Sequence, residues 1–231
     1  MLEYLTFETH PRPDAAVIWL HGLGANGHDF EPIVPELKLP ANLKIRFIFP
    51  HAPSIAVTVN GGYVMPAWYD IAGQGISFAS GTSSQPAGED EQGMRRSQRQ
   101  INELIEAEKK KGIAPNRIIL AGFSQGGAMT LFAGLRYPER LAGLMVLSAY
   151  LPLPDKLTAE MSESNAKTSV FMAHGKQDGV VPFEGARISK EFLLKRGVPV
   201  EWHEYTMQHS LHPQEIRDIS AWIQARLIPL A

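Results

Sequence analysis

The sequence of 231 residues contains no cysteine, and this absence excludes several kinds of chemistry at once. Without thiols the chain has no disulfides, no thiolate metal ligands and no iron–sulfur ligation, and a cysteine nucleophile is excluded. Any covalent catalysis must therefore use another side chain.

The chain also lacks an excess of charge of either sign, with 22 Lys and Arg residues against 24 Asp and Glu residues. A formal net charge of −2 leaves no basic surplus that could attract a phosphate backbone or an anionic lipid surface. We therefore expect no nucleic-acid partner.

Long hydrophobic runs are missing as well. The longest apolar stretch without charge, residues 141–154, holds 14 residues and includes Ser148 and two prolines, whereas a membrane-spanning helix needs about 20. The first 14 residues show no basic segment followed by an apolar core, so they do not resemble a signal peptide. We expect a cytoplasmic protein without stable membrane insertion.

Short runs of β-branched and aromatic residues alternate with longer amphipathic segments along the chain. This alternation predicts one α/β domain over residues 1–231, with a mostly parallel central sheet and helices on both faces. The predicted strands are 17–20, 45–49, 117–121, 143–148, 169–173 and 200–205. The predicted helices are 90–111, 126–136, 184–196 and 213–227, of which the first has acidic residues at its start, lysines at its end and Gly112 behind it.

Residues 54–88 interrupt the alternation, because Gly, Ser, Asn and Pro recur throughout this stretch. We interpret it as a long excursion from the domain and not as a second domain. Loops of this length are usually functional or disordered. An island of large side chains between Tyr63 and Tyr69 favours a function, while 73–88 is compatible with simple flexibility.

The segment GFSQG at 122–126 is the strongest functional signal, because it directly follows a predicted strand and directly precedes a predicted helix. This context is typical of a nucleophile elbow, a strained turn that exposes a serine hydroxyl at the N-terminus of a helix. A G-x-S-x-G motif in an ordinary surface turn has no catalytic role. The context favours Ser124 as a catalytic nucleophile.

A serine nucleophile needs a base and an acid that orients the base, and in this architecture the acid precedes the histidine along the chain. Asp178 follows the predicted strand 169–173 and lies at the same carboxyl edge of the sheet as Ser124. Asp155, one strand earlier, is the alternative. The short glycine-containing turn before Asp178 favours Asp178 as the acid. Asp155 can also be interpreted as a solvated loop residue.

Three late histidines are candidates for the base. His203 alternates within the predicted strand 200–205, and His212 directly precedes Pro213, where it is expected to cap the following helix. His209 lies between them, beyond the carboxyl end of the strand. Its position at the edge of the sheet makes it the favoured base.

A glycine-rich loop, residues 22–27, follows the first predicted parallel strand and also spells G-x-G-x-x-G. A dinucleotide site requires an acidic residue about 20 positions further on, and the next strand ends FPH without one. The better interpretation is an oxyanion loop, in which the backbone N–H groups of Leu23 and Gln125 bind the developing negative oxygen. The eight histidines show neither H-E-x-x-H nor a carboxylate cluster, so no metal site and no cofactor are expected.

Several segments resemble those of one family along nearly the whole chain. They are WLHGLGA (19–25), PHAP (50–53), MPAWYD (65–70), GFSQGGA (122–128), the HG that precedes Asp178 and HS (209–210). The G-x-S-x-G segment alone indicates only an α/β-hydrolase. In combination with WYD and HGLGA, it makes the chain similar to the phospholipase/carboxylesterase family, which includes acyl-protein thioesterases and small prokaryotic carboxylesterases.

The resemblance implies an α/β-hydrolase fold and the same roles for Ser124, Asp178 and His209 as their placement does. It further implies that Met65 and Trp68 line an acyl-binding groove. Only about 20 residues separate the strands 143–148 and 169–173, too few for an independent cap domain.

The expected function is that of a serine carboxylesterase that hydrolyses short- to medium-chain acyl esters and thioesters through an acyl-enzyme on Ser124. An acyl-protein thioesterase or a lysophospholipase is the alternative within the same chemistry. A noncatalytic binding module of the same fold is the alternative of another class, and it predicts a lost triad member that the sequence does not show. The partner is a small-molecule ester or thioester, and the sequence leaves a homodimer open.

Overall fold

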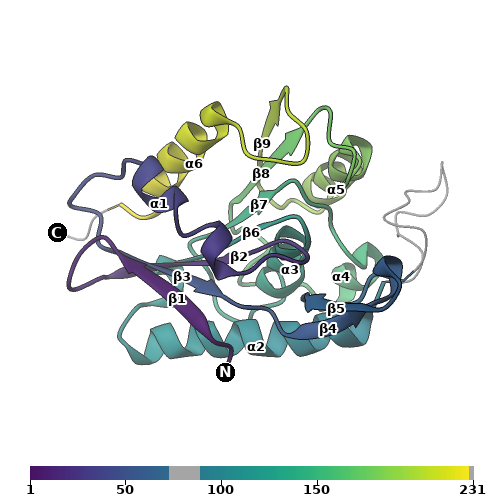
Figure 1. Ribbon diagram of the computed structural model, residues 1–231. Coiled ribbons are helices and arrows are strands. Elements are labelled where there is room, and N and C mark those ends of the chain that lie inside the picture. The colour runs from purple at the N-terminus through teal and green to yellow at the C-terminus, as the bar shows by residue number, and fades with distance from the viewer. Residues whose placement is uncertain (73–88, 229–231) are drawn as a thin grey trace.

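A seven-stranded sheet forms the centre of the computed structural model, which describes residues 1–72 and 89–228 (Figure 1). β1 is antiparallel to β3, and all other neighbouring strands of this sheet are parallel. The predicted mostly parallel α/β sheet is therefore confirmed. In spatial order the strands are β1 (Tyr4–Glu8), β3 (Ile45–Pro50), β2 (Ala15–Leu20), β6 (Ile118–Phe123), β7 (Gly143–Leu147), β8 (Val170–Gly175) and β9 (Val200–Tyr205).

The central strand β2 shows why the sheet needs helices on both faces. All six of its residues are buried. Its even-numbered side chains belong to one hydrophobic core and its odd-numbered side chains to the other, because successive residues of a strand point to opposite faces. A strand without a polar face is stable only between two layers of helices.

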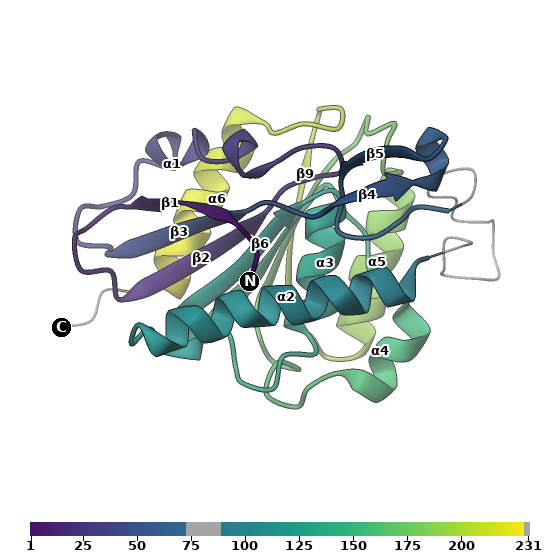
Figure 2. The same cartoon turned by 60° about the horizontal axis from the view of Figure 1, so that its bottom comes forward.

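Two sets of helices supply these layers (Figure 2). One core receives side chains from α2 (Glu91–Lys110), α3 (Gln125–Gly134), α4 (Pro154–Glu160) and α5 (Phe183–Lys195). The opposite core receives them from α1 (Ile33–Glu36) and α6 (Pro213–Arg226). The central sheet is thereby covered on both faces, and its edge of carboxyl strand ends is left for the connecting loops.

The long helix α2 begins and ends as its sequence predicts. The side chain of Asp90 accepts a hydrogen bond of 2.8 Å from the backbone N–H of Gly93 and so caps the first turn. Gly112 has a φ of +96° just past the last turn, a conformation that glycine adopts without strain.

Some elements were not predicted. Residues 54–66, expected to be irregular, form an antiparallel ribbon of β4 (Ser54–Val57) and β5 (Tyr63–Pro66), in which Val57 pairs with Tyr63. The first strand β1 and the short helix α4 were also missed, because each is too short to give a clear period. Residues 73–88, the second half of the predicted excursion, lie outside the described part of the chain.

The connection between β7 and β8 contains only the seven-residue helix α4 and turns. As predicted, this connection is too short to hold a cap domain. Among the described residues, no helix combines the length and the apolar character that a membrane span requires.

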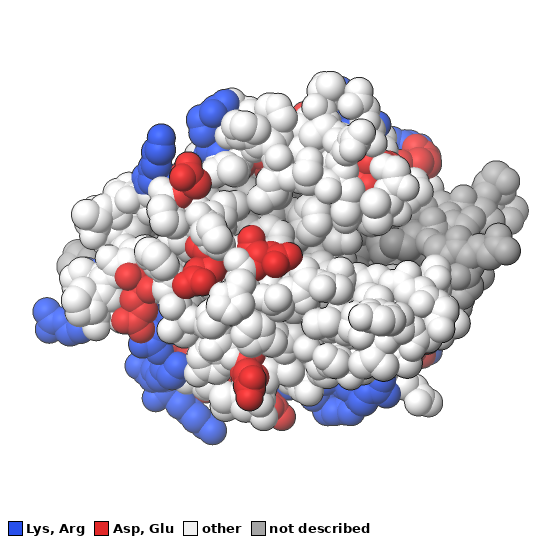
Figure 3. All heavy atoms as spheres, viewed as in Figure 1, with Lys and Arg blue, Asp and Glu red and all other residues white. Residues whose placement is uncertain are grey.

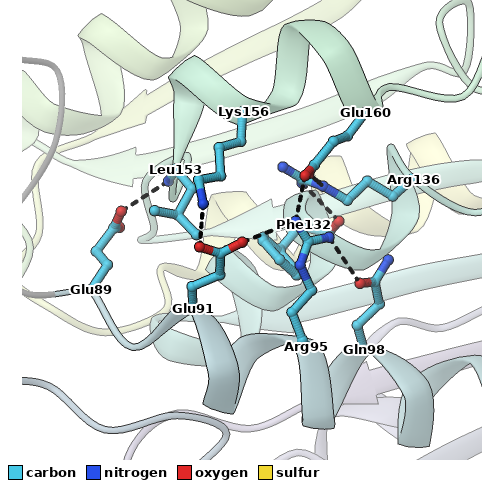
Figure 4. A network of polar contacts seen from close by, with 9 residues as sticks. All are labelled: Glu89, Glu91, Arg95, Gln98, Phe132, Arg136, Leu153, Lys156 and Glu160. Carbon is cyan, nitrogen blue, oxygen red and sulfur yellow. Dashed lines mark hydrogen bonds and ion pairs between the residues drawn. The ribbon is translucent and has the colours of Figure 1, made fainter.

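An ion-pair network joins α2 to α4 across the end of α3 (Figure 4). Arg136 donates a hydrogen bond of 2.6 Å to Glu160 and one of 3.0 Å to the carbonyl oxygen of Phe132, and its guanidinium lies 4.1 Å from the centre of the Phe132 ring. Arg95 bonds both Glu91 and Glu160. We call these residues and Lys156, which pairs with Glu91, the α2–α4 network.

Candidate active site

Ser124 occupies the sharp turn between β6 and α3. Its φ of 54° and ψ of −120° lie in a strained region for a residue with a side chain. The backbone N–H of Ser124 donates to the carbonyl oxygen of Leu147 in the neighbouring strand, at 2.9 Å. The turn is therefore tied to the sheet, and this tie holds the serine in its strained conformation.

The glycines of GFSQG are required by close packing. A Cβ atom on Gly122 would lie 2.2 Å from the carbonyl oxygen of Gly126, and one on Gly126 would lie 2.3 Å from that of Leu20. Both distances are shorter than any tolerable contact, so the helix α3 can approach β2 and β6 only because these two positions lack side chains.

The loop after β2 is held by a buried histidine. His21 is fully buried, and its Nε2 atom accepts a hydrogen bond of 3.0 Å from the backbone N–H of Ala52. Its Nδ1 atom therefore carries the proton and donates to the carbonyl oxygen of Gly22 at 2.7 Å. Burial lowers the pKa of His21, so the neutral ring that this arrangement requires is favoured. The main chain that leads to Leu23 is fixed as a result.

The side chain of Gln125 connects three segments that are far apart in the sequence. Its carbonyl oxygen accepts from the backbone N–H of Trp68 at 2.8 Å, and its amide donates to the carbonyl oxygen of Tyr69, also at 2.8 Å. The indole N–H of Trp68 in turn donates to the carbonyl oxygen of His21 at 2.8 Å. The turn at Ser124, the WYD segment and the glycine-rich loop thus form one hydrogen-bonded unit.

This unit corrects the expected role of Trp68. The side chain was expected along an acyl groove, but the residue is only 2% exposed and its indole supports the loop after β2. Met65 is half-buried on β5, and its sulfur lies 3.6 Å from the position that a Cβ atom on Gly24 would take. Met65 therefore stays a candidate for acyl contact, whereas Trp68 is a structural support.

Asp178 and His209 meet at the carboxyl edge of the sheet. Oδ2 of Asp178 accepts a hydrogen bond of 2.7 Å from Nδ1 of His209, while Oδ1 accepts from the backbone N–H groups of Val180 and Val181 at 2.9 Å each. Burial alone would raise the pKa of Asp178, but these hydrogen bonds outweigh it, and the net pKa is lowered. The carboxylate is thus kept charged beside the imidazole.

A second histidine, His174, lies against the same carboxylate. It is 1% exposed, and its Nε2 atom lies 2.9 Å from the carbonyl oxygen of Val181 and 3.4 Å from Oδ2 of Asp178. Burial lowers its pKa, which favours a neutral ring. As a donor at Nε2, His174 ties down the turn whose amides bind Asp178.

The alternative acid and bases lie elsewhere. His212 is the N-cap of α6, at the helix start where it was expected, and it forms a capping box with Glu215. His203 stacks on Phe171 with ring centres 4.7 Å apart and contacts Glu201 at 2.9 Å. Asp155 is an exposed residue in the first turn of α4. None of the three lines the pocket described below.

A pocket of about 720 Å³ opens above Ser124. It brings together the nucleophile candidate, the histidine and the glycine-rich loop, together with residues that the sequence did not single out. Its lining consists of Gly22, Leu23, Ala25, Asp29, Phe30, Phe123, Ser124, Val180, His209, Ser210 and Leu211. The described part of the chain contains no group of three His, Asp or Glu residues placed to hold a metal ion.

Comparison with known proteins gives one consistent picture. A family model described as Phospholipase/Carboxylesterase matches residues 6–227. An acyl-protein thioesterase 1 of Gibberella zeae is 39% identical over 230 residues, which cover 97% of this chain and 96% of that protein. The carboxylesterase SOBER1 of Arabidopsis thaliana is 34% identical over 212 residues, covering 91% and 90% of the two chains.

Solved structures agree with the sequence relatives. A crystal structure of Arabidopsis thaliana SOBER1 superposes with a TM-score of 0.82 at 32% identity, over 92% of this chain and 99% of that one. Acyl-protein thioesterase 2 of Zea mays superposes with a TM-score of 0.81 at 26% identity, over 98% of this chain and 100% of that one.

Proposed function

Since the chain belongs to the phospholipase/carboxylesterase family, it is an ester hydrolase, and we propose that it hydrolyses short- to medium-chain acyl esters and thioesters through an acyl-enzyme on Ser124. The observation that carries the proposal is the 2.7 Å hydrogen bond between His209 and Asp178 at a pocket shared with Ser124. These residues combine a nucleophile, a base and an orienting carboxylate.

In the first half of the reaction, the Oγ atom of Ser124 attacks the acyl carbon and its proton passes to Nε2 of His209. The charged carboxylate of Asp178 stabilises the resulting imidazolium through the hydrogen bond to Nδ1. The imidazolium then donates its proton to the oxygen or sulfur of the leaving group, and the bond between the acyl carbon and that atom breaks.

In the second half, His209 takes a proton from water, and the hydroxide adds to the acyl carbon of the ester on Ser124. The bond to Oγ breaks, the carboxylic acid leaves, and Oγ recovers its proton from His209. In both halves the backbone N–H groups of Leu23 and Gln125 donate to the oxygen that becomes negative. The hydrogen bonds of His21 and Gln125 keep these donors in place before the substrate arrives.

Acyl-protein deacylation is the second candidate, because the Gibberella zeae relative carries the name acyl-protein thioesterase. We favour small esters, since the acyl contacts proposed near Met65 need no protein surface. Each buried CH₂ contributes about 0.8 kcal/mol, close to a fourfold gain in kcat/KM while the pocket has room for it.

A series of p-nitrophenyl esters from acetate to palmitate, measured beside one S-acylated peptide, tests this order of substrates. We expect kcat/KM to rise along the chain and then to level off, with the peptide below the best ester. A peptide that is deacylated far faster than every simple ester would make the acyl-protein activity the main one. Absence of hydrolysis of all of them would contradict the proposed function itself.

A further inference from the structure

A row of aromatic rings leads away from the catalytic histidine candidate along the pocket. The ring of Phe123 lies 4.7 Å from the ring of His209, and the ring of Phe30 lies 5.6 Å from that of Phe123, centre to centre. All three residues line the pocket. The faces and edges of these rings therefore form a continuous apolar wall that starts at the proton-donating group.

Asp29 directly precedes Phe30 in the chain, and it also lines the pocket. The residue is exposed, and it makes no ion pair with any other described residue. Among the described residues that line the pocket, only Asp29 and His209 have ionisable side chains, and none is Lys or Arg. The pocket thus carries a single negative charge, that of Asp29.

Acidic side chains on the surrounding surface add to the negative electrostatic potential of Asp29. On the face shown in Figure 3, acidic side chains occupy the middle of the view, over the region of α1 and the turn before it, and basic side chains lie at the periphery. Asp29, Glu31 and Glu36 belong to this stretch of the chain. A cation that approaches the pocket is attracted, and an anion is repelled.

We propose that Asp29, together with the rings of Phe30 and Phe123, forms a cation subsite that favours esters and thioesters whose leaving group carries an ammonium or guanidinium group. The inference rests on the proposed function. In that mechanism His209 donates a proton to the leaving atom, so the leaving group extends from His209 along the aromatic row towards Asp29. Aromatic faces and a carboxylate are the groups that together bind quaternary and primary ammonium ions.

Butyrylthiocholine and its neutral isostere S-(3,3-dimethylbutyl) thiobutyrate test the subsite, because they differ in one atom and one charge. A thiol reagent reports both reactions, and since the chain has no cysteine, it detects only the released thiol. The two thiols differ in their intrinsic ability to leave. This difference cancels when the ratio of the two kcat/KM values is compared between variants.

We expect Asp29→Asn to lower the ratio of cationic to neutral kcat/KM about three- to tenfold. The ratio of the wild-type protein should also fall at 0.5 M NaCl, since salt screens an exposed charge. Glu36→Gln is the matched control. It removes one negative charge from the same acidic surface but does not line the pocket, and its ratio should stay within about twofold of the wild type.

An unchanged ratio in Asp29→Asn, or an equal fall in Glu36→Gln, would overturn the subsite while hydrolysis by Ser124 stands. The proposed function fails in a different way: either neither thioester is hydrolysed, or Ser124→Ala hydrolyses both as fast as the wild type. The two failures are therefore distinguishable in one set of measurements.

Discussion

Two regions of the molecule contain connected polar side chains, and the bonding partners differ between the two regions. Around Ser124, the buried side chains of His21, Gln125 and Asp178 bond mainly to backbone N–H and C=O groups. In the α2–α4 network, charged side chains bond mainly to one another.

This difference in bonding partners matches two tasks, the positioning of catalytic groups and the packing of helices. A backbone group has a fixed place in the fold, so a side chain bonded to it is held in one position, as pre-organised catalysis requires. Long charged side chains that bond one another can adjust together, which suffices to keep two helices packed. Variants near Ser124 should therefore change rates with little effect on stability, and variants of the α2–α4 network should do the opposite.

The largest expected effect is that of Ser124→Ala. We expect kcat for ester hydrolysis to fall by about 10⁴- to 10⁶-fold, with little further loss when His209→Ala is added, because triad members act as a unit. Thermal unfolding should stay near that of the wild type, since the serine hydroxyl makes no contact that the fold needs. A fluorophosphonate probe should label the wild type and the exposed control Ser164→Ala but not Ser124→Ala.

The choice among the late histidines is the next test. His209→Ala should lose nearly as much activity as Ser124→Ala, because the serine then has no base to take its proton. His212→Ala should keep its rate and lose about 1 kcal/mol of stability, because it removes the N-cap of α6. A severe rate loss in His212→Ala beside a mild one in His209→Ala would reverse the assignment.

A pair of substitutions at His174 sharpens the comparison further. Gln places an amide N–H near the position of the imidazole Nε2 atom, which contacts Val181 and Asp178, whereas Asn can replace only Nδ1. We expect His174→Asn to lower kcat by about ten- to a hundredfold and His174→Gln to retain most of it. Equal rates in the two variants, at matched melting temperatures, would remove His174 from the positioning of Asp178.

The α2–α4 network should respond in stability and not in rate. Arg136→Met keeps the contact with the Phe132 ring but leaves Glu160 with one partner fewer, and Arg136 is 3% exposed. We expect a loss of about 1–3 kcal/mol in the free energy of unfolding by urea, with kcat/KM unchanged. Lys156→Met, at an exposed end of the same network, should cost at most about 0.5 kcal/mol. A tenfold change in kcat/KM for Arg136→Met would contradict the division of tasks.

A pH-dependent effect on stability concerns Glu89, which accepts a hydrogen bond of 2.9 Å from the backbone N–H of Leu153 (Figure 4). Burial raises the pKa of Glu89 to about 7, despite that hydrogen bond. Between its ordinary pKa of 4.5 and about 7, the folded state binds more protons than the unfolded state, so stability falls as the pH rises through this window.

Glu89→Gln cannot ionise and should remove about 2 kcal/mol of the fall in stability between pH 5 and pH 7.5. Urea unfolding at pH 5 and pH 7.5, with the exposed control Glu163→Gln beside it, measures the effect. The same slope in Glu89→Gln and in the wild type would mean that Glu89 does not titrate in this range.

The meeting of Asp178 and His209 could be predicted because parallel strands bring their carboxyl ends to one edge of the sheet. Each residue follows a strand that the sequence predicts, 169–173 before Asp178 and 200–205 before His209, so their place at that edge needed no knowledge of side-chain contacts. The place of His212 at the start of α6 was predictable because it directly precedes Pro213, whereas its capping partner Glu215 was not singled out.

The support of the site was not predictable in this way. The hydrogen bond between Gln125 and Trp68 spans 57 residues of sequence, and nothing local in either segment indicates it. Trp68 was assigned to an acyl groove because the family resemblance implies it, although the fold uses its indole N–H inside the protein. The sequence did not single out Asp29, because the pocket that it lines forms only where separate segments of the chain meet.

Two contacts join the residues on either side of 73–88. The backbone N–H of Asp70 donates to the carboxylate of Asp90 at 3.1 Å, and Ile71 pairs with Glu89 in an isolated bridge. Both ends of the intervening stretch are thus fastened at one place, and the entropy of closing a loop rises only slowly with its length. Because these contacts already hold Asp70 and Ile71 beside Glu89 and Asp90, we expect a change in the number of residues between them to alter the free energy of unfolding only slightly.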